Sequence, residues 1–200
     1  MSQLFPLIIG LALFLGGHLI SRLPNVKARL SAYFGPRVFR AIYSIWALMG
    51  LAMIVHGFGV YRAAGYIQVW NPPKFLAHLA IILVWLAFVL AVAGDIHLKG
   101  GRIKAFAKHP LLLAVKVWAT AHLLANGDLG SMILFGSFLA WAVFARIALK
   151  KAGDFGNPEA GKHSNSNRDD LIAIVGGSIL ALLFMFWLHR LLIGVGIFGN

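Results

Sequence analysis

Residues 75–92 read FLAHLAIILVWLAFVLAV, a stretch that contains one histidine, His78, and no charged residue. An α-helix needs about 20 mainly apolar residues to cross the roughly 30 Å hydrocarbon core of a membrane. The stretch is therefore long enough and apolar enough to be a membrane span. Two of the five similar stretches are short, 4–20 and 110–125, so a five-helix bundle with one buried or re-entrant segment stays open. Counting all of them predicts six spans, at 4–20, 39–60, 75–92, 110–125, 129–148 and 171–187.

The composition of the whole 200-residue chain is that of a membrane protein. It is 60% hydrophobic and only 12% charged, whereas soluble domains are about 25% charged. The absence of cysteine excludes a disulfide scaffold, a zinc–thiolate site, an iron–sulfur cluster and covalently attached c-type haem. We expect a single all-α domain over residues 1–200, a polytopic membrane helical bundle in the lipid bilayer. The sequence leaves its oligomeric state open.

The basic residues gather in alternate connections between the predicted spans. The chain has 18 Lys and Arg against 6 Asp and Glu, and the positive-inside rule places basic loops in the cytoplasm and both termini outside. No basic segment is interleaved with aromatic residues for base stacking, so we expect no nucleic-acid partner. The polar tract at 153–170 is expected to be a solvated loop. The basic residues of the three connections are Arg22, Lys27, Arg29, Arg37, Arg40; Lys99, Arg102, Lys104, Lys108; and Arg146, Lys150, Lys151, Lys162, Arg168.

Histidine carries most of the polar chemistry within and beside the spans. Ionisable residues at membrane depth are energetically costly and mark candidate functional sites. Those near helix ends are expected to have interfacial roles, as we predict for His97, His163 and His189. The remaining candidates are His18, His56, His78, His109 and His122.

The fourth predicted span lies within the stretch KHPLLLAVKVWATAHLLANGD at residues 108–128. Pro110 suits the first turn of a helix, and Trp118, His122 and Asn126 then recur every four residues along one face. Such a face can hold a planar cofactor, with His122 as a metal ligand and Trp118 as a packing wall. It can equally be a polar contact between helices. We expect Asp128 to cap the turn that follows, and the Lys116 side chain to extend toward the interface.

Several motifs resemble those of the NnrU family of bacterial membrane proteins. They are Lys108-His109-Pro110, Trp118-x-x-x-His122, Asn126-Gly127-Asp128, Gly17-His18 and the pattern Phe34-Gly-x-Arg37-x-Phe39-Arg40-x-x-Tyr43-Ser44. The resemblance covers nearly the whole chain. NnrU proteins are similar to the plant and cyanobacterial 15-cis-zeta-carotene isomerases, which are integral membrane haem b enzymes.

The resemblance implies a haem b whose two ligands are His18 and His122, with His78 and His109 as further shared histidines. It also implies a multi-pass protein of the bacterial inner membrane, linked to nitrite and nitric oxide metabolism in denitrification. A haem-dependent, redox-type isomerisation of a lipophilic isoprenoid is the activity that the isomerases suggest. They carry a cysteine after the tryptophan where this chain has Ala119, so a thiolate ligand is excluded here.

The predicted depths of the two ligands do not match well. His18 lies three residues before Ser21 at the cytoplasmic edge of its span. His122 lies 13 residues after His109, or about 20 Å further along its helix. His56 and His78 match His122 better in depth, so a ligand pair of His78 and His122 stays open beside the pair from the resemblance.

Two other function classes stay open. The motif Lys108-His109-Pro110 also resembles the isoprenylcysteine carboxyl methyltransferase superfamily, which implies an S-adenosylmethionine site at the inner face of the membrane. The other alternative is a non-catalytic accessory protein of respiratory nitrogen-oxide enzymes. The sequence lacks a Gly-x-Ser-x-Gly elbow, a P-loop and the paired His-x-x-x-His boxes of membrane di-iron enzymes. Whether the protein is an enzyme, and on which substrate, is not determined by the sequence.

Overall fold

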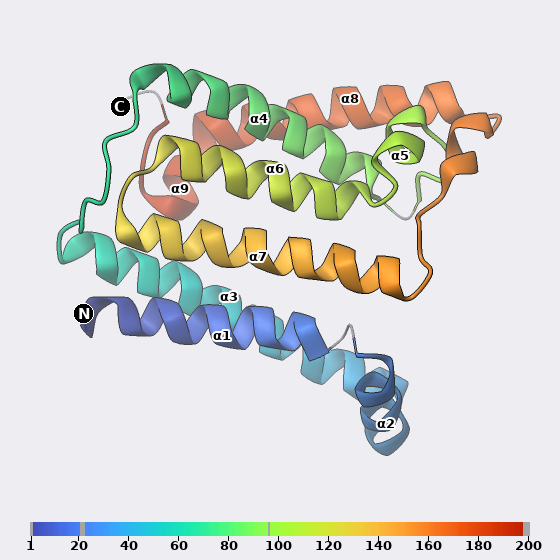
Figure 1. The fold of residues 1–200 in the computed structure, drawn as a ribbon, viewed down its shortest axis with the longest axis horizontal. Helices are drawn as coiled ribbons and strands as arrows, with labels where there is room; N and C mark the ends of the chain where they lie inside the picture. Colours follow the sequence, from blue (N-terminus) through green and yellow to red (C-terminus); the bar gives the residue numbers. More distant parts are fainter. Residues whose placement is uncertain (1, 21–22, 96, 198–200) are drawn as a thin grey trace. The chain divides into compact units, whose positions relative to one another are not determined.

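The computed structural model describes residues 2–20, 23–95 and 97–197, and every regular element within them is helical (Figure 1). Five helices are long and apolar enough to cross a membrane, so the predicted all-helical membrane fold is confirmed. They are α1 (Phe5–Ile20, after a 3-10 turn at Ser2–Leu4), α3 (Pro36–Ala63), α4 (Lys74–Ala93), α7 (Leu129–Lys151) and α8 (Ser166–Leu183) with its continuation to Ile193.

The sixth predicted span forms a shorter helix, α6 (Pro110–Ala125). Its 16 residues extend about 24 Å, less than the roughly 30 Å of a hydrocarbon core. The count of six spans and the placement of both termini outside therefore stay predictions. Proline opens α6 as expected, because the first turn of a helix does not use its N–H.

Two of the basic connections contain helices that the apolar pattern did not indicate. They are α2 (Pro24–Phe34) and α5 (Arg102–Ala107), both of which are too polar or too short to be found as spans. Arg22, counted in the first basic connection, lies outside the described residues. The third basic connection contains only a 3-10 turn at Pro158–Lys162.

The chain divides into two compact units, and the division falls within α7 between Trp141 and Ala142. The first unit contains Met1–Asn71 and Gly127–Trp141, and the second contains Pro72–Asn126 and Ala142–Asn200. Each unit is described by itself below. The prediction of one domain over residues 1–200 stays a prediction.

In the first unit, α1 packs against α3 through glycines (Figure 1). A Cβ atom at Gly57 would lie 2.3 Å from the backbone nitrogen of Leu7, and one at Gly10 would lie 2.6 Å from that of Ile54. Trp46 adds a polar contact, because its Nε1 donates to the carbonyl oxygen of Leu13 at 2.9 Å. Helix interfaces in membranes are enriched in small residues, because these let the two backbones approach closely.

In the second unit, α4 packs against both α6 and α8. A Cβ at Gly177 of α8 would lie 2.5 Å from the Cα of Val89 in α4, so the two backbones are in close contact. Trp85 Nε1 donates to Ser178 Oγ at 2.9 Å between the same two helices. Two of the three predicted basic connections meet at one end of this unit, because α5 packs against the turn at Pro158–Lys162, as the charge pattern requires.

The expectation that the whole polar tract at 153–170 is solvated is wrong at its carboxyl-terminal end. Asp169 is only 3% exposed, and its Oδ2 accepts from the backbone N–H of Gly100 at 2.8 Å. Asp170 accepts from the N–H groups of Arg102 and Ile103, at 2.8 and 3.1 Å, in the first turn of α5. The tract was judged by its composition, which does not reveal that the amino-terminal N–H groups of α5 need acceptors.

Candidate functional site

His18 lies near the end of α1, and one of its ring nitrogens is fixed by the helix itself. Nδ1 lies 2.8 Å from the carbonyl oxygen of Phe14, one turn earlier. A carbonyl oxygen can only accept, so Nδ1 donates the proton and, in the neutral ring, Nε2 carries the lone pair. This is the tautomer in which a histidine ligates a metal through Nε2 while its other nitrogen is held by a hydrogen bond.

Three aromatic side chains from α1, α3 and α7 surround the His18 ring. The ring centroids of Phe14, Tyr43 and Trp141 lie 4.4, 5.5 and 5.7 Å from that of His18, and Trp141 meets it edge-on. Trp141 Nε1 is buried and has no hydrogen-bond partner among the residues that the structure describes. Leaving a buried N–H without an acceptor is costly, so a ligand atom that accepts from it would be stabilised beside His18.

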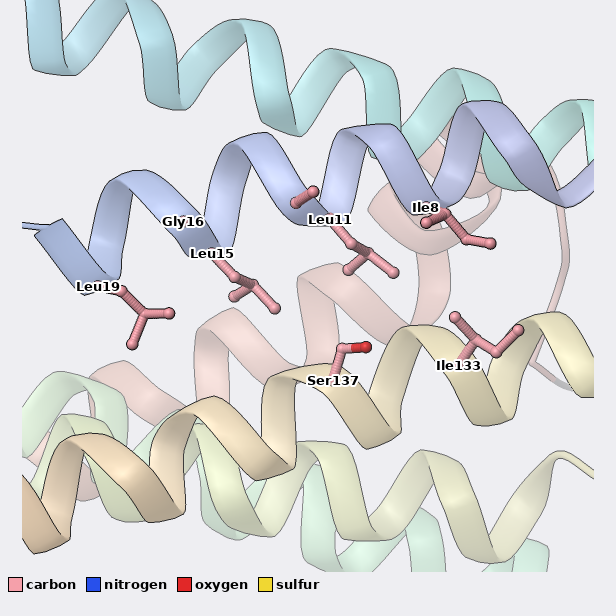
Figure 2. A pocket seen from close by; sticks show the side chains of 8 residues that line it. Ile8, Leu11, Leu15, Gly16, Leu19, Ile133 and Ser137 are labelled. Carbon is pink, nitrogen blue, oxygen red and sulfur yellow. The ribbon is translucent and has the colours of Figure 1, made fainter.

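An apolar groove runs along the same helix, between α1 and the first half of α7. Figure 2 shows leucine and isoleucine side chains of α1 pointing toward Ile133 and Ser137 of α7. Its volume is about 360 Å³, within the range of small-molecule sites. Ser137 contributes the hydroxyl group seen in Figure 2. The groove suits an elongated apolar molecule, and its lining residues in α1 are Ile8, Leu11, Ala12, Leu15, Gly16 and Leu19.

His18 lies beside this groove. It follows the lining residue Leu15 by three positions and precedes Leu19 by one, and residues three positions apart are neighbours on a helix surface. Phe14, which accepts the Nδ1 hydrogen bond through its carbonyl, lies on the side of α1 that packs against Gly50 of α3. His18 thus lies between the groove and the packed face of α1.

In the second unit, Trp118, His122 and Asn126 form the column that their spacing predicts. His122 Nδ1 donates to the carbonyl oxygen of Trp118 at 2.9 Å, and the two rings lie 5.1 Å apart. His122 therefore has the same tautomer as His18, with the lone pair on Nε2. Asn126 Nδ2 donates to the carbonyl oxygen of His122 at 2.8 Å, so its side chain caps the end of α6. A cofactor contact by Asn126 stays a prediction.

His189 is a residue of this region that the sequence did not indicate. It was expected to have an interfacial role, yet it lies close enough to interact electrostatically with His122. It begins α9 (His189–Ile193), directly after a π-helical turn at Phe184–Leu188, and such turns are frequent at functional sites. Its Nδ1 donates to the carbonyl oxygen of Val195 at 2.8 Å. No local pattern could relate His189 to His122, because only tertiary packing brings the two together.

The other two histidines shared with the isomerases are His78 and His109, which lie in α4 and at the start of α6. The side chain of His78 in α4 is exposed, as is that of His56 in α3. His109 lies at the opposite end of α6, where its Nε2 is 3.4 Å from Asp154 Oδ1. The described residues contain no group of three His, Cys, Asp or Glu side chains that could hold a metal ion, but a haem iron needs only one or two axial side chains. His18 and His122 each have a tautomer that fits such a ligand.

Asp128 caps the turn that follows α6, as we expected from the sequence. This residue is buried, and its Oδ1 accepts from the backbone N–H of Ser131 at 2.9 Å in the first turn of α7. Gln68 pairs with Asp128 as an isolated antiparallel bridge. Asp128 therefore organises the start of α7 in the first unit.

These observations define a class of protein, a polytopic helical membrane protein. The chain belongs to the NnrU family, because the family described as NnrU protein matches residues 6–197. The match includes every candidate site residue named above. No curated protein and no solved structure matches the chain.

Proposed function

We propose that this protein binds haem b in the bacterial inner membrane, with His18 and His122 as its axial ligands. The observation that carries the proposal is the hydrogen bond that each ring makes from Nδ1 to the carbonyl oxygen four residues earlier, 2.8 Å for His18 and 2.9 Å for His122. These hydrogen bonds support the proposal, because they leave Nε2 as the nitrogen that would ligate the iron. When bound, haem b supplies one-electron redox chemistry at its iron.

Aromatic side chains lie beside each of the two proposed ligands within its own unit. Phe14, Tyr43 and Trp141 pack around His18, and Trp118 packs beside His122. The Nε1–H of Trp141 supplies a hydrogen-bond donor at the His18 side. Hydrophobic surroundings and hydrogen bonds of this kind tune both the ligand strength and the potential of a haem.

The substrate that we propose is a lipophilic isoprenoid seated in the groove between α1 and α7. The apolar lining beside His18 suits a polyene chain, and a redox-type isomerisation would need its double bonds near the haem. The physiological setting that the family name suggests is nitrite and nitric oxide metabolism. Both statements extend the haem proposal and depend on it.

The first experiment is an absorption spectrum of the full chain, purified in detergent from cells supplied with a haem precursor. We expect a Soret band, sharp b-type α and β bands on reduction, and about one haem per chain in a pyridine haemochrome assay. A colourless protein from haem-replete cells would refute the proposal. That result would favour the S-adenosylmethionine-dependent methyltransferase or the accessory protein instead.

The ligand pair is tested by single substitutions with chemical rescue. We expect His18→Gly and His122→Gly to lose the bis-histidine spectrum, and added imidazole to restore it, because imidazole replaces the missing ligand without repairing a misfolded chain. His56→Gly is the matched control, since that side chain is exposed in α3. An unchanged spectrum for His18→Gly, together with loss for His78→Gly or His189→Gly, would assign the second ligand to one of those residues.

The groove is tested by filling it. Gly16 lines the groove, and a Cβ at this position would meet no atom within 4 Å, so Gly16→Leu should fold and occupy the space. We expect haem content to be unchanged and the binding of a linear polyene, measured by tryptophan quenching, to fall. Gly59→Leu in α3 is the control, because a Cβ there also meets nothing within 4 Å. Equal polyene binding in both variants would exclude the groove as the substrate site.

A further inference from the structure

The short helix α2 (Pro24–Phe34) lies in the first unit, where α1 ends and α3 begins (Figure 1). The backbone N–H of Leu23 donates to the carbonyl oxygen of Ile20, the last residue of α1, at 3.1 Å. On its other side, α2 packs against α3, and Gly35 is the single residue between the two helices. Because α1 and α3 are both long and apolar enough to cross a membrane, α2 is held close to the membrane boundary.

One face of α2 is apolar and largely uncovered by the described part of the chain. Val26, Leu30 and Tyr33 follow one another at intervals of four and three residues, so they share a face of the helix. Tyr33 is 84% exposed and Val26 is 38% exposed. Phe34 is also exposed, and its ring meets that of Tyr33 edge-on. An exposed apolar face of this kind marks a surface that lipid or another protein covers.

Four exposed basic side chains accompany this apolar face. Each residue turns an α-helix by about 100°, which places Lys27 and Arg29 on either side of the face. Arg37 and Arg40 follow in the first two turns of α3. All four side chains are exposed, and none of them forms an ion pair with another described residue. Arg40 donates from Nε to the carbonyl oxygen of Pro36, at 3.1 Å in its own helix, so its charge is not neutralised there.

The first unit offers almost no acid to these basic residues. Residues 1–94 contain no Asp or Glu, so the single acid of the unit is Asp128. Asp128 is buried, and its Oδ1 accepts from the N–H of Ser131 in α7. It pairs with Gln68, which follows the far end of α3, and the 28 residues of α3 extend about 42 Å. The basic residues at the α2 end therefore need a partner that carries negative charge.

We propose that α2 lies in the membrane interface, with its apolar face in the lipid, and binds the headgroups of anionic phospholipids. Interfacial helices of this kind bury their apolar face about 5–10 Å into the boundary between headgroups and acyl chains. Long basic side chains beside such a face extend to the lipid phosphates, and an anionic membrane surface supplies the negative charge that the first unit lacks. The proposal does not depend on haem binding. The headgroup ligands are Lys27, Arg29, Arg37 and Arg40.

The position of α2 is tested with spin labels at single cysteines, because the full chain has no cysteine of its own. Val26→Cys and Tyr33→Cys carry the label on the apolar face, whereas Ala28→Cys and Ala32→Cys carry it on the opposite, equally exposed face. The chain is reconstituted in vesicles of phosphatidylcholine and phosphatidylglycerol in equal amounts. We expect the ratio of oxygen accessibility to that of a water-soluble nickel chelate to be severalfold higher on the apolar face, since oxygen concentrates in lipid.

Two other results of the labelling would overturn the proposal. The same ratio at all four positions would mean that α2 extends into water. Low accessibility to both reagents on the apolar face would mean that protein covers it, either a second copy of the chain or another partner.

The basic residues are tested by the choice between two lipids. A fluorescent label at Tyr33→Cys is quenched by nitroxide-labelled phosphatidylglycerol or phosphatidylcholine that binds beside it, and the two quenching curves give the relative affinity. We expect phosphatidylglycerol to be preferred about fivefold or more, which is the factor that one Lys or Arg close to an anionic surface contributes. Lys27→Gln with Arg29→Gln should remove most of this preference.

The matched control is Lys150→Gln with Lys151→Gln, which removes the same charge from exposed positions at the end of α7 and should leave the preference unchanged. Lys27→Arg with Arg29→Lys keeps both charges and should retain the preference, so that its loss in the glutamine variant cannot be attributed to misfolding. No preference for phosphatidylglycerol in the labelled chain, or the same preference in both glutamine variants, would overturn the proposal.

Discussion

The contact between α1 and α3 makes the sharpest quantitative prediction, through the substitution Gly57→Ala. The added Cβ would lie 2.3 Å from the nitrogen and 2.7 Å from the Cα of Leu7, and 2.7 Å from the carbonyl carbon of Pro6. All three are backbone atoms, so no side-chain rotation can relieve the overlap. Ordinary contact begins at about 3.4 Å, so the two helices would have to move about 1.1 Å apart at this point.

The expected loss follows from two opposing effects. Replacing glycine by alanine inside a helix normally stabilises it by about 0.5–1 kcal/mol. Overpacking of a well-packed contact costs about 1–3 kcal/mol. Gly59 lies two residues further along α3 and its Cβ would meet nothing within 4 Å, so Gly59→Ala experiences only the favourable effect. We therefore expect Gly57→Ala to be about 1–3 kcal/mol less stable than Gly59→Ala.

The assay is reversible unfolding of the full chain in mixed micelles with increasing sodium dodecyl sulfate, followed by circular dichroism. The two variants have identical composition, so micelle effects cancel in the difference between their unfolding free energies. Haem content is a second readout, because α3 carries Tyr43 against the His18 ring at a centroid distance of 5.5 Å. If Gly57→Ala unfolds at the same detergent fraction as Gly59→Ala, the close approach of α1 and α3 does not exist as described and the reasoning is refuted.

Three further predictions concern the packing around the sites. Asp169→Ala leaves the N–H of Gly100 without its acceptor in a buried position and should cost about 1–3 kcal/mol in the same unfolding assay. The control is Glu159→Ala, which removes an exposed ion pair with Lys162 and should cost under about 0.5 kcal/mol. Equal losses of stability in the two variants would contradict the role of Asp169. Tyr61→Phe removes the hydroxyl that accepts from the N–H of Ile67 at 3.0 Å and should destabilise by about 1 kcal/mol or more, detectable as faster amide exchange at Ile67; unchanged exchange would count against it. Trp141→Phe should keep haem but shift its reduction potential relative to wild type, since the indole N–H beside His18 is lost, and an identical potential would show that this donor does not face the cofactor.

Local patterns in the sequence were sufficient for much of the candidate site. The four-residue spacing of Trp118, His122 and Asn126 requires only that the segment be helical, and the hydrogen bonds between successive members are contacts one turn apart. The capping role of Asp128 is equally local. The aromatic side chains around His18 are different, because Tyr43 and Trp141 are separated from His18 along the chain by distances that carry no periodic signal.

The sequence by itself determined that this is an all-helical membrane protein of the NnrU family, because long uncharged stretches can satisfy their backbone hydrogen bonds in lipid only as helices. It also determined where the basic connections lie. Only the tertiary structure decided which glycines bring α1 and α3 into backbone contact, and that Asp169 is buried where composition predicted solvent. The hydrophobicity of a segment determines that it lies in the lipid as a helix. The shapes and charges of its packed faces determine which other helices it contacts.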